Sequence, residues 1–196
     1  MKRKRRIIPV VLMAGALILL MSLPGTAAGA ESDNDPPRFQ GRNFPFAIVR
    51  PVQPAPITPL HTLKGGVTTL RRFSGKVVLL YLWATWCPVC VYEMPSLDKL
   101  QARLSGDRFT AVSLSVDSRG ARAVLPFLRR LGIKNLPVYL DPVGRAAEAL
   151  EVGQGLPWTF LIDHRGRVMG YMKGAADWDT PEGQALIRYY TGRIPR

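Results

Sequence analysis

The residues best suited to chemistry are two cysteines, Cys87 and Cys90, which are separated by two positions. A thiolate attacks a disulfide, and a second thiol one helical turn away can release the mixed disulfide that forms. The pair follows an apolar run and opens a segment with helical periodicity. At a helix N-terminus, unpaired backbone N–H groups and the positive end of the dipole stabilise a thiolate. We therefore predict that Cys87 is the attacking thiol and Cys90 the resolving thiol.

Other uses of the dithiol have weaker support. A structural disulfide across two residues closes a very small loop and constrains the unfolded chain little. Zinc requires two further ligands, and the chain offers only His61 and His164, each expected in an exposed loop. Attachment of a c-type haem requires histidine after the second cysteine, where Val91 stands. A Cu(I) chaperone remains an alternative because thiolates favour Cu(I), although Met94 is the only nearby thioether. We predict no metal site and no cofactor beyond the redox-active disulfide.

Two segments must position the dithiol. Residues 76–83 are a short, nearly continuous apolar run, which predicts a central strand covered on both faces. Residues 88–104 predict a helix, because Pro88 suits its first turn and apolar residues recur every three or four positions. Pro95 lies inside this helix and is expected to kink it or offset its axis. The inward face is predicted to carry Met94, Leu97, Leu100 and Leu104.

The remaining pattern alternates strands with helices, which is typical of an α/β domain. Gly65-Gly66 predicts the turn of a small hairpin within residues 62–70. Thr180 is a good N-cap for a last helix with Pro181 at its first position. The other predicted elements are strands at 109–116, 138–140, 159–162 and 167–172, and helices at 121–131 and 144–150.

The N-terminus resembles a targeting segment. Residues 2–6 are all basic, residues 7–23 are mostly apolar, and residues 28–30 fit the small-x-small pattern read by signal peptidase. The apolar run is at the short end of the roughly 17–25 residues that span a bilayer. Residues 1–30 are thus predicted to be a cleaved signal peptide or a retained membrane anchor. Either way the domain is delivered across the membrane.

Amino-acid composition predicts where the tether ends and the domain begins, and it limits the classes of binding partner. Residues 31–58 are rich in proline and predict an extended tether, part of which lies against the domain at residues 59–196. The formal net charge is +13, but outside the leader the basic residues are dispersed as pairs such as Arg71-Arg72 and Arg129-Arg130. No basic stripe is interleaved with aromatic residues, so no nucleic-acid partner is predicted. A solvated basic surface, facing anionic lipid or an acidic partner, fits better.

Several motifs in order resemble the TlpA/ResA/DsbE group of thioredoxin-like proteins, over roughly residues 59–174. Such an ordered series is far more specific than one CxxC motif. The motifs are Gly75-Lys76-Val77-Val78-Leu79-Leu80, Trp83-Ala84-Thr85-Trp86-Cys87-Pro88-Val89-Cys90, Glu93-Met94-Pro95, Val116-Asp117 and Gly155-Leu156-Pro157-Trp158-Thr159-Phe160-Leu161-Ile162-Asp163.

The resemblance implies a thioredoxin fold, with a central mixed sheet flanked by helices and a strand–helix insertion between residues 117 and 150. It also implies roles for individual residues. Pro157 matches the family's cis-proline facing the dithiol, and Leu156 would offer its backbone to a substrate peptide by strand addition. Trp86 and Pro88 would wall the same substrate site. Glu93 matches a family acid that could relay protons during exchange; the alternative is a solvated glutamate that complements the helix dipole.

The sequence also departs from the wider thioredoxin pattern. Typical thioredoxins have a buried aspartate six residues before the first cysteine, where this chain has Tyr81. Tyr81 is predicted to be a core residue, which leaves Glu93 as the better candidate for proton transfer. Trp158 follows the proline where a small polar residue is common, and it either narrows the substrate groove or packs internally.

The resemblance favours an exported thiol–disulfide oxidoreductase located in the periplasm, either free or tethered to the inner membrane. It implies reduction of specific protein disulfides, as in cytochrome c maturation or copper-site assembly. A membrane electron donor would then re-reduce Cys87 and Cys90, since an exported dithiol needs a source of electrons. A disulfide oxidase or isomerase would use the same residues and differ only in potential, so it remains an alternative.

Overall fold

The computed structural model describes residues 35–196, and the compact unit within it begins at Pro36. The predicted leader at residues 1–30 lies outside the described residues. An eight-stranded mixed sheet forms the centre, in the order β1-β8-β7-β4-β5-β6-β2-β3. Within residues 35–196, no helix combines the length and apolar character needed to cross a bilayer.

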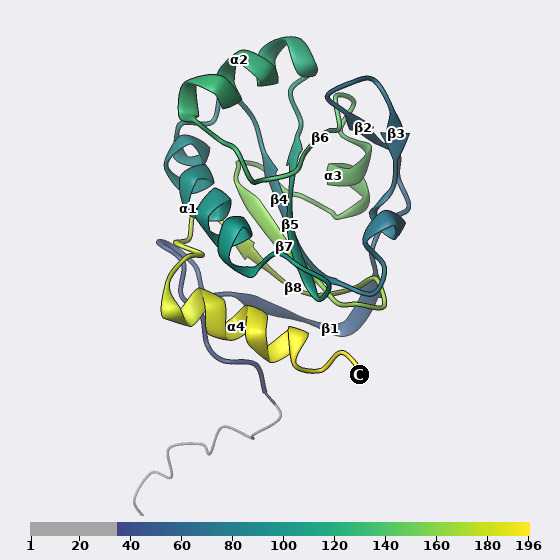
Figure 1. Ribbon diagram of the computed structural model, residues 1–196, viewed down its shortest axis with the longest axis vertical. Helices are drawn as coiled ribbons and strands as arrows, with labels where there is room; N and C mark the ends of the chain where they lie inside the picture. Colours follow the sequence, from purple (N-terminus) through teal and green to yellow (C-terminus); the bar gives the residue numbers. More distant parts are fainter. Residues whose placement is uncertain (1–34) are drawn as a thin grey trace, which may run out of the picture. The chain divides into compact units, whose positions relative to one another are not determined.

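The elements agree closely with the alternation expected from the sequence (Figure 1). The strands are β1 (Ala47–Pro54), β2 (Leu60–Thr62), β3 (Val67–Thr68), β4 (Val77–Trp83), β5 (Phe109–Ser115), β6 (Val138–Leu140), β7 (Trp158–Ile162) and β8 (Arg167–Lys173). The helices are the 3-10 helix η1 (Leu70–Phe73), α1 (Pro88–Leu104), α2 (Ala121–Leu131), α3 (Arg145–Ala149) and α4 (Pro181–Thr191).

Strand β4 is central because its seven residues are all buried and it has a partner on each side. It pairs in parallel with β5 and antiparallel with β7. A strand covered on both faces needs apolar side chains on both, which explains the continuous apolar run at this position. The chain leaves the end of β4 at Trp83 and enters α1 five residues later, so β4 and α1 together position the dithiol.

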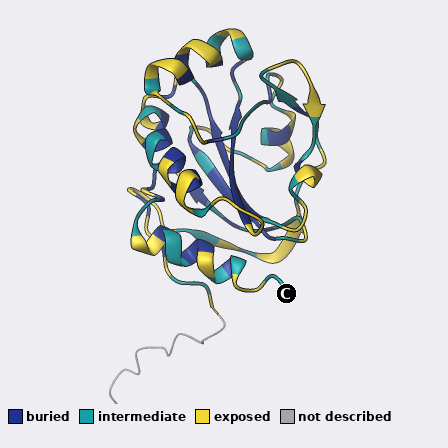
Figure 2. Ribbon diagram, viewed as in Figure 1, coloured by how far each residue is buried: buried dark blue, intermediate teal, exposed yellow. Residues whose placement is uncertain are grey.

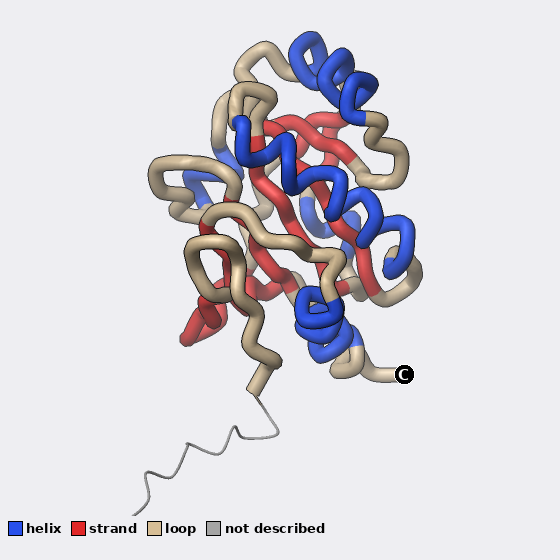
Figure 3. The backbone as a smooth tube through the Cα atoms, turned by 90° about the vertical axis from the view of Figure 1, so that its left-hand side faces the viewer, coloured by secondary structure: helices blue, strands red, loops and turns tan. Residues whose placement is uncertain are grey.

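The two faces of the sheet pack against different elements. Alternate β4 residues such as Leu79 and Tyr81 join a core with α1, α2 and α4, whereas Leu80 and Leu82 join a second core that includes η1 and α3. Figure 3 shows α1 running across the first face, with α2 and α4 beside its two ends. In Figure 2 the central strands are buried and the outer sides of the helices are exposed.

The tether predicted at residues 31–58 requires a correction of its boundary. Residues 47–54 form β1, which pairs antiparallel with β8 as an edge strand of the sheet. Prolines are tolerated there because an edge strand has one row of N–H groups free of the ladder. Gly170 of β8 permits the close approach, since a Cβ at this position would lie 2.5 Å from the carbonyl oxygen of Ala47. The domain therefore extends well before residue 59.

Several local predictions are confirmed and one is wrong. The predicted hairpin forms as the β2–β3 pair, but over residues 60–68, two positions earlier than expected, and Thr180 caps α4 by accepting a hydrogen bond from the Gly183 N–H. Helix α1 includes Pro95. The histidines are not exposed loop residues: His61 lies in β2 and is half-buried, and His164 is half-buried in the β7–β8 turn. Strand pairing with β3 and β6 covers His61, which the short hairpin pattern did not reveal.

Candidate active site

Cys87 and Cys90 form a disulfide at the beginning of α1 (S–S 2.15 Å). Cys87 is the N-cap residue, and its sulfur accepts a hydrogen bond from the Cys90 N–H at 3.2 Å. Pro88 occupies the first turn, where its missing N–H leaves no bond unmade. Cys87 therefore lies where the helix terminus stabilises negative charge on sulfur, as predicted.

Exposure separates the two sulfurs. Cys87 is 4% exposed, whereas Cys90 is completely buried. The residues around Cys87 are much more open, with Trp86 67% and Val89 44% exposed, and Pro88 is exposed as well. A visiting protein can thus meet an apolar surface around Cys87, and of the two cysteines only Cys87 has any exposed surface.

Pro157 lies at the same end of the sheet. The Leu156–Pro157 peptide bond is cis, as the resemblance implies, and Pro157 is buried directly before β7. Trp158 pairs with Leu82, so the beginning of β7 adjoins the end of β4 from which the dithiol loop leaves. Among the described residues, the backbone of half-buried Leu156 makes no hydrogen bond. These groups are open to the strand addition expected for a substrate peptide.

Glu93 is buried, with 3% of its surface exposed, so the alternative of a solvated glutamate is wrong. Its Oε1 accepts hydrogen bonds from the Ala176 N–H (3.1 Å) and the Trp178 indole N–H (3.0 Å), while Oε2 has no partner among the described residues. Burial raises the pKa of Glu93 to about 8, against the lowering effect of these bonds, of Tyr81 and of the Arg42 charge. The carboxyl is therefore protonated at neutral pH and able to donate.

Tyr81 links the carboxyl to the dithiol. It is completely buried, as predicted, and its hydroxyl donates to the Cys90 carbonyl oxygen at 3.4 Å. Burial, followed by the neighbouring Glu93, raises the pKa of Tyr81 well above its ordinary value. The tyrosine therefore stays neutral and lies between Glu93 and the turn that carries Cys90.

Asp117 holds the loop before Cys87. Its carboxylate accepts hydrogen bonds from the Thr85 N–H (2.9 Å), the Thr85 hydroxyl (2.6 Å) and the Ser115 hydroxyl (2.7 Å). Because Asp117 follows β5 and Thr85 follows β4, these bonds join the ends of two paired strands. They fix the backbone that positions Trp86 and Cys87.

Trp158 is half-buried, packs against neighbouring aromatic rings and lines a cavity of about 510 Å³. Its ring contacts those of Phe160 and Tyr171, with centroids 6.1 and 5.4 Å away, and its indole N–H donates to the Gly155 carbonyl oxygen. Lys173 lies over the same ring at 5.6 Å. The tryptophan thus braces the segment that leads into Pro157.

Sequence reasoning missed Trp178 and Arg42 as neighbours of the carboxyl. Both come from segments without motif character, and Trp178 reaches Glu93 across 85 positions. Phe39 packs on Trp178 with ring centroids 4.7 Å apart. Buried tryptophans usually find a partner for the indole N–H, but the sequence does not indicate which one.

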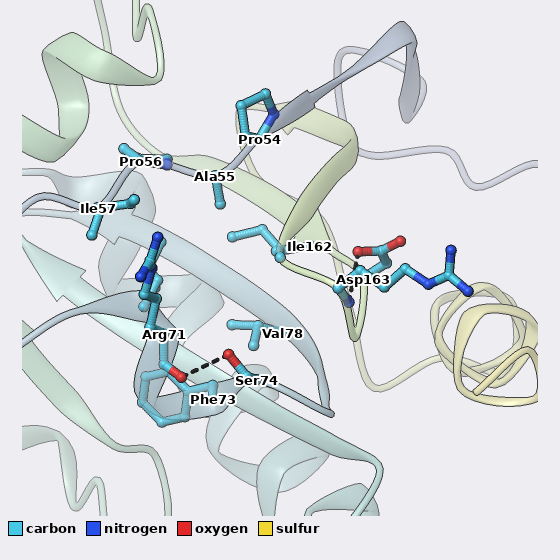
Figure 4. A pocket seen from close by; sticks show the side chains of 13 residues that line it. Pro54, Ala55, Pro56, Ile57, Arg71, Phe73, Ser74, Val78, Ile162 and Asp163 are labelled. Carbon is cyan, nitrogen blue, oxygen red and sulfur yellow. Dashed lines mark hydrogen bonds between the residues drawn. The ribbon is translucent and has the colours of Figure 1, made fainter. Parts of the chain in front are cut away.

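A cavity of about 430 Å³ lies at the opposite end of the sheet and contains none of the predicted site residues. Its walls include Val78 near the start of β4, Ile162 at the end of β7, and residues 54–57 (Figure 4). Cys87 follows the other end of β4, and the strand from Val77 to Trp83 is roughly 20 Å long at about 3.3 Å per residue. The cavity is thus separate from the dithiol.

Comparison with known proteins gives the family. The profile of the AhpC/TSA family matches residues 51–170. The chain belongs to the AhpC/TSA family. Thiol-disulfide oxidoreductase ResA of Bacillus thuringiensis subsp. konkukian is 33% identical over 120 residues, 61% of this chain and 68% of that protein. Thioredoxin-like protein YneN of Bacillus subtilis is 33% identical over 116 residues, 58% of this chain and 66% of YneN.

Solved structures agree with this AhpC/TSA assignment. A DsbE-type thiol:disulfide interchange protein from Chlorobium tepidum superposes with a TM-score of 0.65 at 28% identity, covering 72% of this chain and 97% of the other. The fold is therefore thioredoxin-like, as predicted. Within the AhpC/TSA family, this chain is a thiol–disulfide oxidoreductase that acts on protein dithiols and disulfides.

Proposed function

We propose that the protein is an exported reductase that reduces disulfides of specific periplasmic proteins, of the kind needed in cytochrome c maturation or copper-site assembly. The ResA and DsbE names of its relatives support this substrate class. Cys87 attacks the substrate disulfide and Cys90 resolves the mixed disulfide. The leader delivers the domain to the periplasm, either free or tethered to the inner membrane, and a membrane electron donor re-reduces the dithiol.

The proposed direction of electron flow rests on the chemical nature of the residue one helical turn after Cys90. That group is the buried acid Glu93, not a cation. A strong oxidant is strong because its reduced form, with a thiolate, is stabilised. An acid gives a thiolate no such stabilisation through its charge, and when ionised it opposes the thiolate. The surroundings therefore favour a reductant.

The proposed steps use only the residues of the chain. The Cys87 thiolate attacks one sulfur of the substrate disulfide, and the other substrate sulfur leaves with a proton. Cys90 then loses its proton, attacks the Cys87 sulfur and frees the second substrate thiol. In this proposal the ionised form of Glu93, which a pKa of about 8 leaves partly populated near neutral pH, accepts the Cys90 proton through Tyr81 or a water. The dithiol is the only redox centre that the reaction needs.

The substrate site is proposed to lie between Trp86 and Pro88 on one side and Leu156 and Pro157 on the other. The free backbone groups of Leu156 support it, because they can pair with an extended substrate segment. Apolar surface at Trp86 and Val89 would bury against the same segment.

Two measurements test the proposal. Equilibration of Cys87 and Cys90 against glutathione should give a potential near that of thioredoxin, about −270 mV; a value near −120 mV would establish the oxidase instead. Cys87→Ser should abolish turnover of an insulin disulfide substrate. Cys90→Ser should accumulate a mixed disulfide through Cys87, which mass spectrometry would identify. Full turnover by Cys90→Ser would overturn the assignment of roles.

A further inference from the structure

Helix α2 and its flanks present a basic surface at the dithiol end of the molecule. We call Arg119, Arg122, Arg129, Arg130 and Lys134 the α2 basic surface; all five are exposed. Residues 118–140 contain no aspartate or glutamate. The carboxylate just before this stretch, Asp117, is buried and bonded to Thr85 and Ser115. Its charge is therefore directed into the protein, away from this surface.

The cations of this surface are unpaired. Within residues 35–196, none of their side chains has a carboxylate within 4.0 Å. The guanidinium of Arg130 lies over the ring of Phe127, 5.3 Å from its centroid. Elsewhere the chain does pair arginines, as Arg167 with Asp163 at 2.6 Å and Arg103 with Asp179 at 3.5 Å. Unpaired like charges repel one another, so this arrangement favours an anionic partner.

A groove joins this surface to the active site. A cavity of about 350 Å³ has Thr85 and Trp86 on one side and α2 on the other, with Arg119 and Arg130 among its walls. The apolar part comes from Ala123, Pro126 and Phe127. Trp86 directly precedes Cys87, so the groove adjoins the loop that carries the attacking sulfur. Figure 1 shows α2 beside the beginning of α1 and away from α4.

We propose that the groove between Trp86 and α2 binds an acidic segment of the substrate protein, with carboxylates close in sequence to the cysteine under attack. This inference rests on the proposed function and specifies its substrate. A carboxylate entering the groove meets Arg119 and Arg130, while an adjacent apolar side chain packs on Trp86 and Phe127. A protein is favoured over a lipid surface because the cations line a groove that adjoins the reacting sulfur, and a headgroup has no disulfide to reduce.

The test uses the protein reduced with dithiothreitol and then desalted. Three small peptides, each closed by one disulfide, carry four flanking residues that are all Glu, all Ser or all Lys. In each reaction the two thiols of the enzyme become a disulfide, and the peptide disulfide becomes two thiols, so electrons and protons balance. We expect the Glu peptide to react about tenfold faster than the Ser peptide, and the Lys peptide more slowly than either. Half-molar salt should remove most of this preference.

Matched variants locate the effect. Arg119→Glu/Arg130→Glu should abolish or reverse the preference for the Glu peptide. Arg71→Glu/Arg72→Glu makes the same change in net charge at exposed residues near the opposite end of β4, and it should retain the preference. Arg119→Gln/Arg130→Gln provides a milder variant that should lower the Glu-to-Ser ratio without introducing negative charge.

The outcomes are distinguishable. Equal rates for the Glu and Ser peptides with the wild-type protein overturn the inference but leave the reductase intact. Reduction of none of the three peptides overturns the reductase itself. A preference lost equally in both double-Glu variants shows general electrostatics and rejects the groove. Binding to phosphatidylglycerol vesicles that Arg119→Glu/Arg130→Glu abolishes, while the Glu preference survives, assigns the surface to lipid and rejects the proposal.

Discussion

Helix α1 buries two carboxylates, Glu93 and Asp98, whose surroundings shift their pKa values in opposite directions. For Asp98 burial also acts to raise the pKa, but hydrogen bonds outweigh it: its Oδ1 accepts from the N–H groups of Lys134, Asn135 and Leu136, and the net pKa is lowered. Glu93 has two donors and an unpaired oxygen, so burial prevails and the pKa rises to about 8. Deeper burial and fewer donors together separate Glu93, with a raised pKa, from Asp98, with a lowered one.

The largest expected effect is on the pH dependence of stability. Folded Glu93 keeps its proton to about pH 8, whereas a glutamate in the unfolded chain releases it near pH 4.5. Between these values the folded state binds more protons, so the unfolding free energy falls as pH rises. At about 1.36 kcal/mol per pH unit, the loss between pH 5 and pH 8 is on the order of 4 kcal/mol. Glu93→Gln should remove this slope in urea unfolding of the oxidised protein, and an unchanged slope would contradict the raised pKa.

Asp98→Ala should act on stability alone. It leaves three backbone N–H groups without their acceptor and should cost about 3 kcal/mol of unfolding free energy at pH 7. Because the folded pKa is lowered, this contribution is present above the ordinary aspartate pKa and is lost as pH falls through the folded value. Reduction of the Ser-flanked peptide should proceed at the wild-type rate. A large loss of rate with retained stability would erase the contrast with Glu93.

Glu93→Gln should also slow exchange by about tenfold, less than the roughly 10²-fold typical of general acid–base catalysis, because Tyr81 and water can still carry the Cys90 proton in the proposed relay. The decisive readout is the pH–rate profile, in which an inflection near pH 8 should disappear. A purely structural role for Glu93 would lower the unfolding free energy but keep that inflection.

Trp178→Phe tests the contrast between Glu93 and Asp98 with the smallest expected effect. It removes the indole donor to Glu93 and should cost about 1 kcal/mol of unfolding free energy. The pKa of Glu93 should rise further, because a bond that favours the ionised form is lost. The inflection in the pH–rate profile would then move to higher pH. A shift to lower pH would mean that water replaces the indole.

Much of the fold could be predicted from local patterns, because residues close in sequence determine each helix and strand around the dithiol. The apolar run of β4, the proline at the start of α1 and the Thr180 cap each specify structure over a few residues. The edge strand β1 was not predicted, because its pairing with β8 joins segments over a hundred residues apart and its prolines favour other conformations. The burial of Glu93 could likewise not be predicted from the sequence, because it depends on contacts with Trp178 and Ala176 in a distant segment.

The packing of Phe39 on Trp178 has a consequence for the segment that precedes β1. Phe39 is buried only a few positions after the first described residue, and the ring it covers donates a hydrogen bond to Glu93. The segment before β1 therefore helps to cover the tryptophan that bonds Glu93. Trimming the chain back to β1 would admit water to the carboxyl and bring its affinity for protons back toward that of a free glutamate.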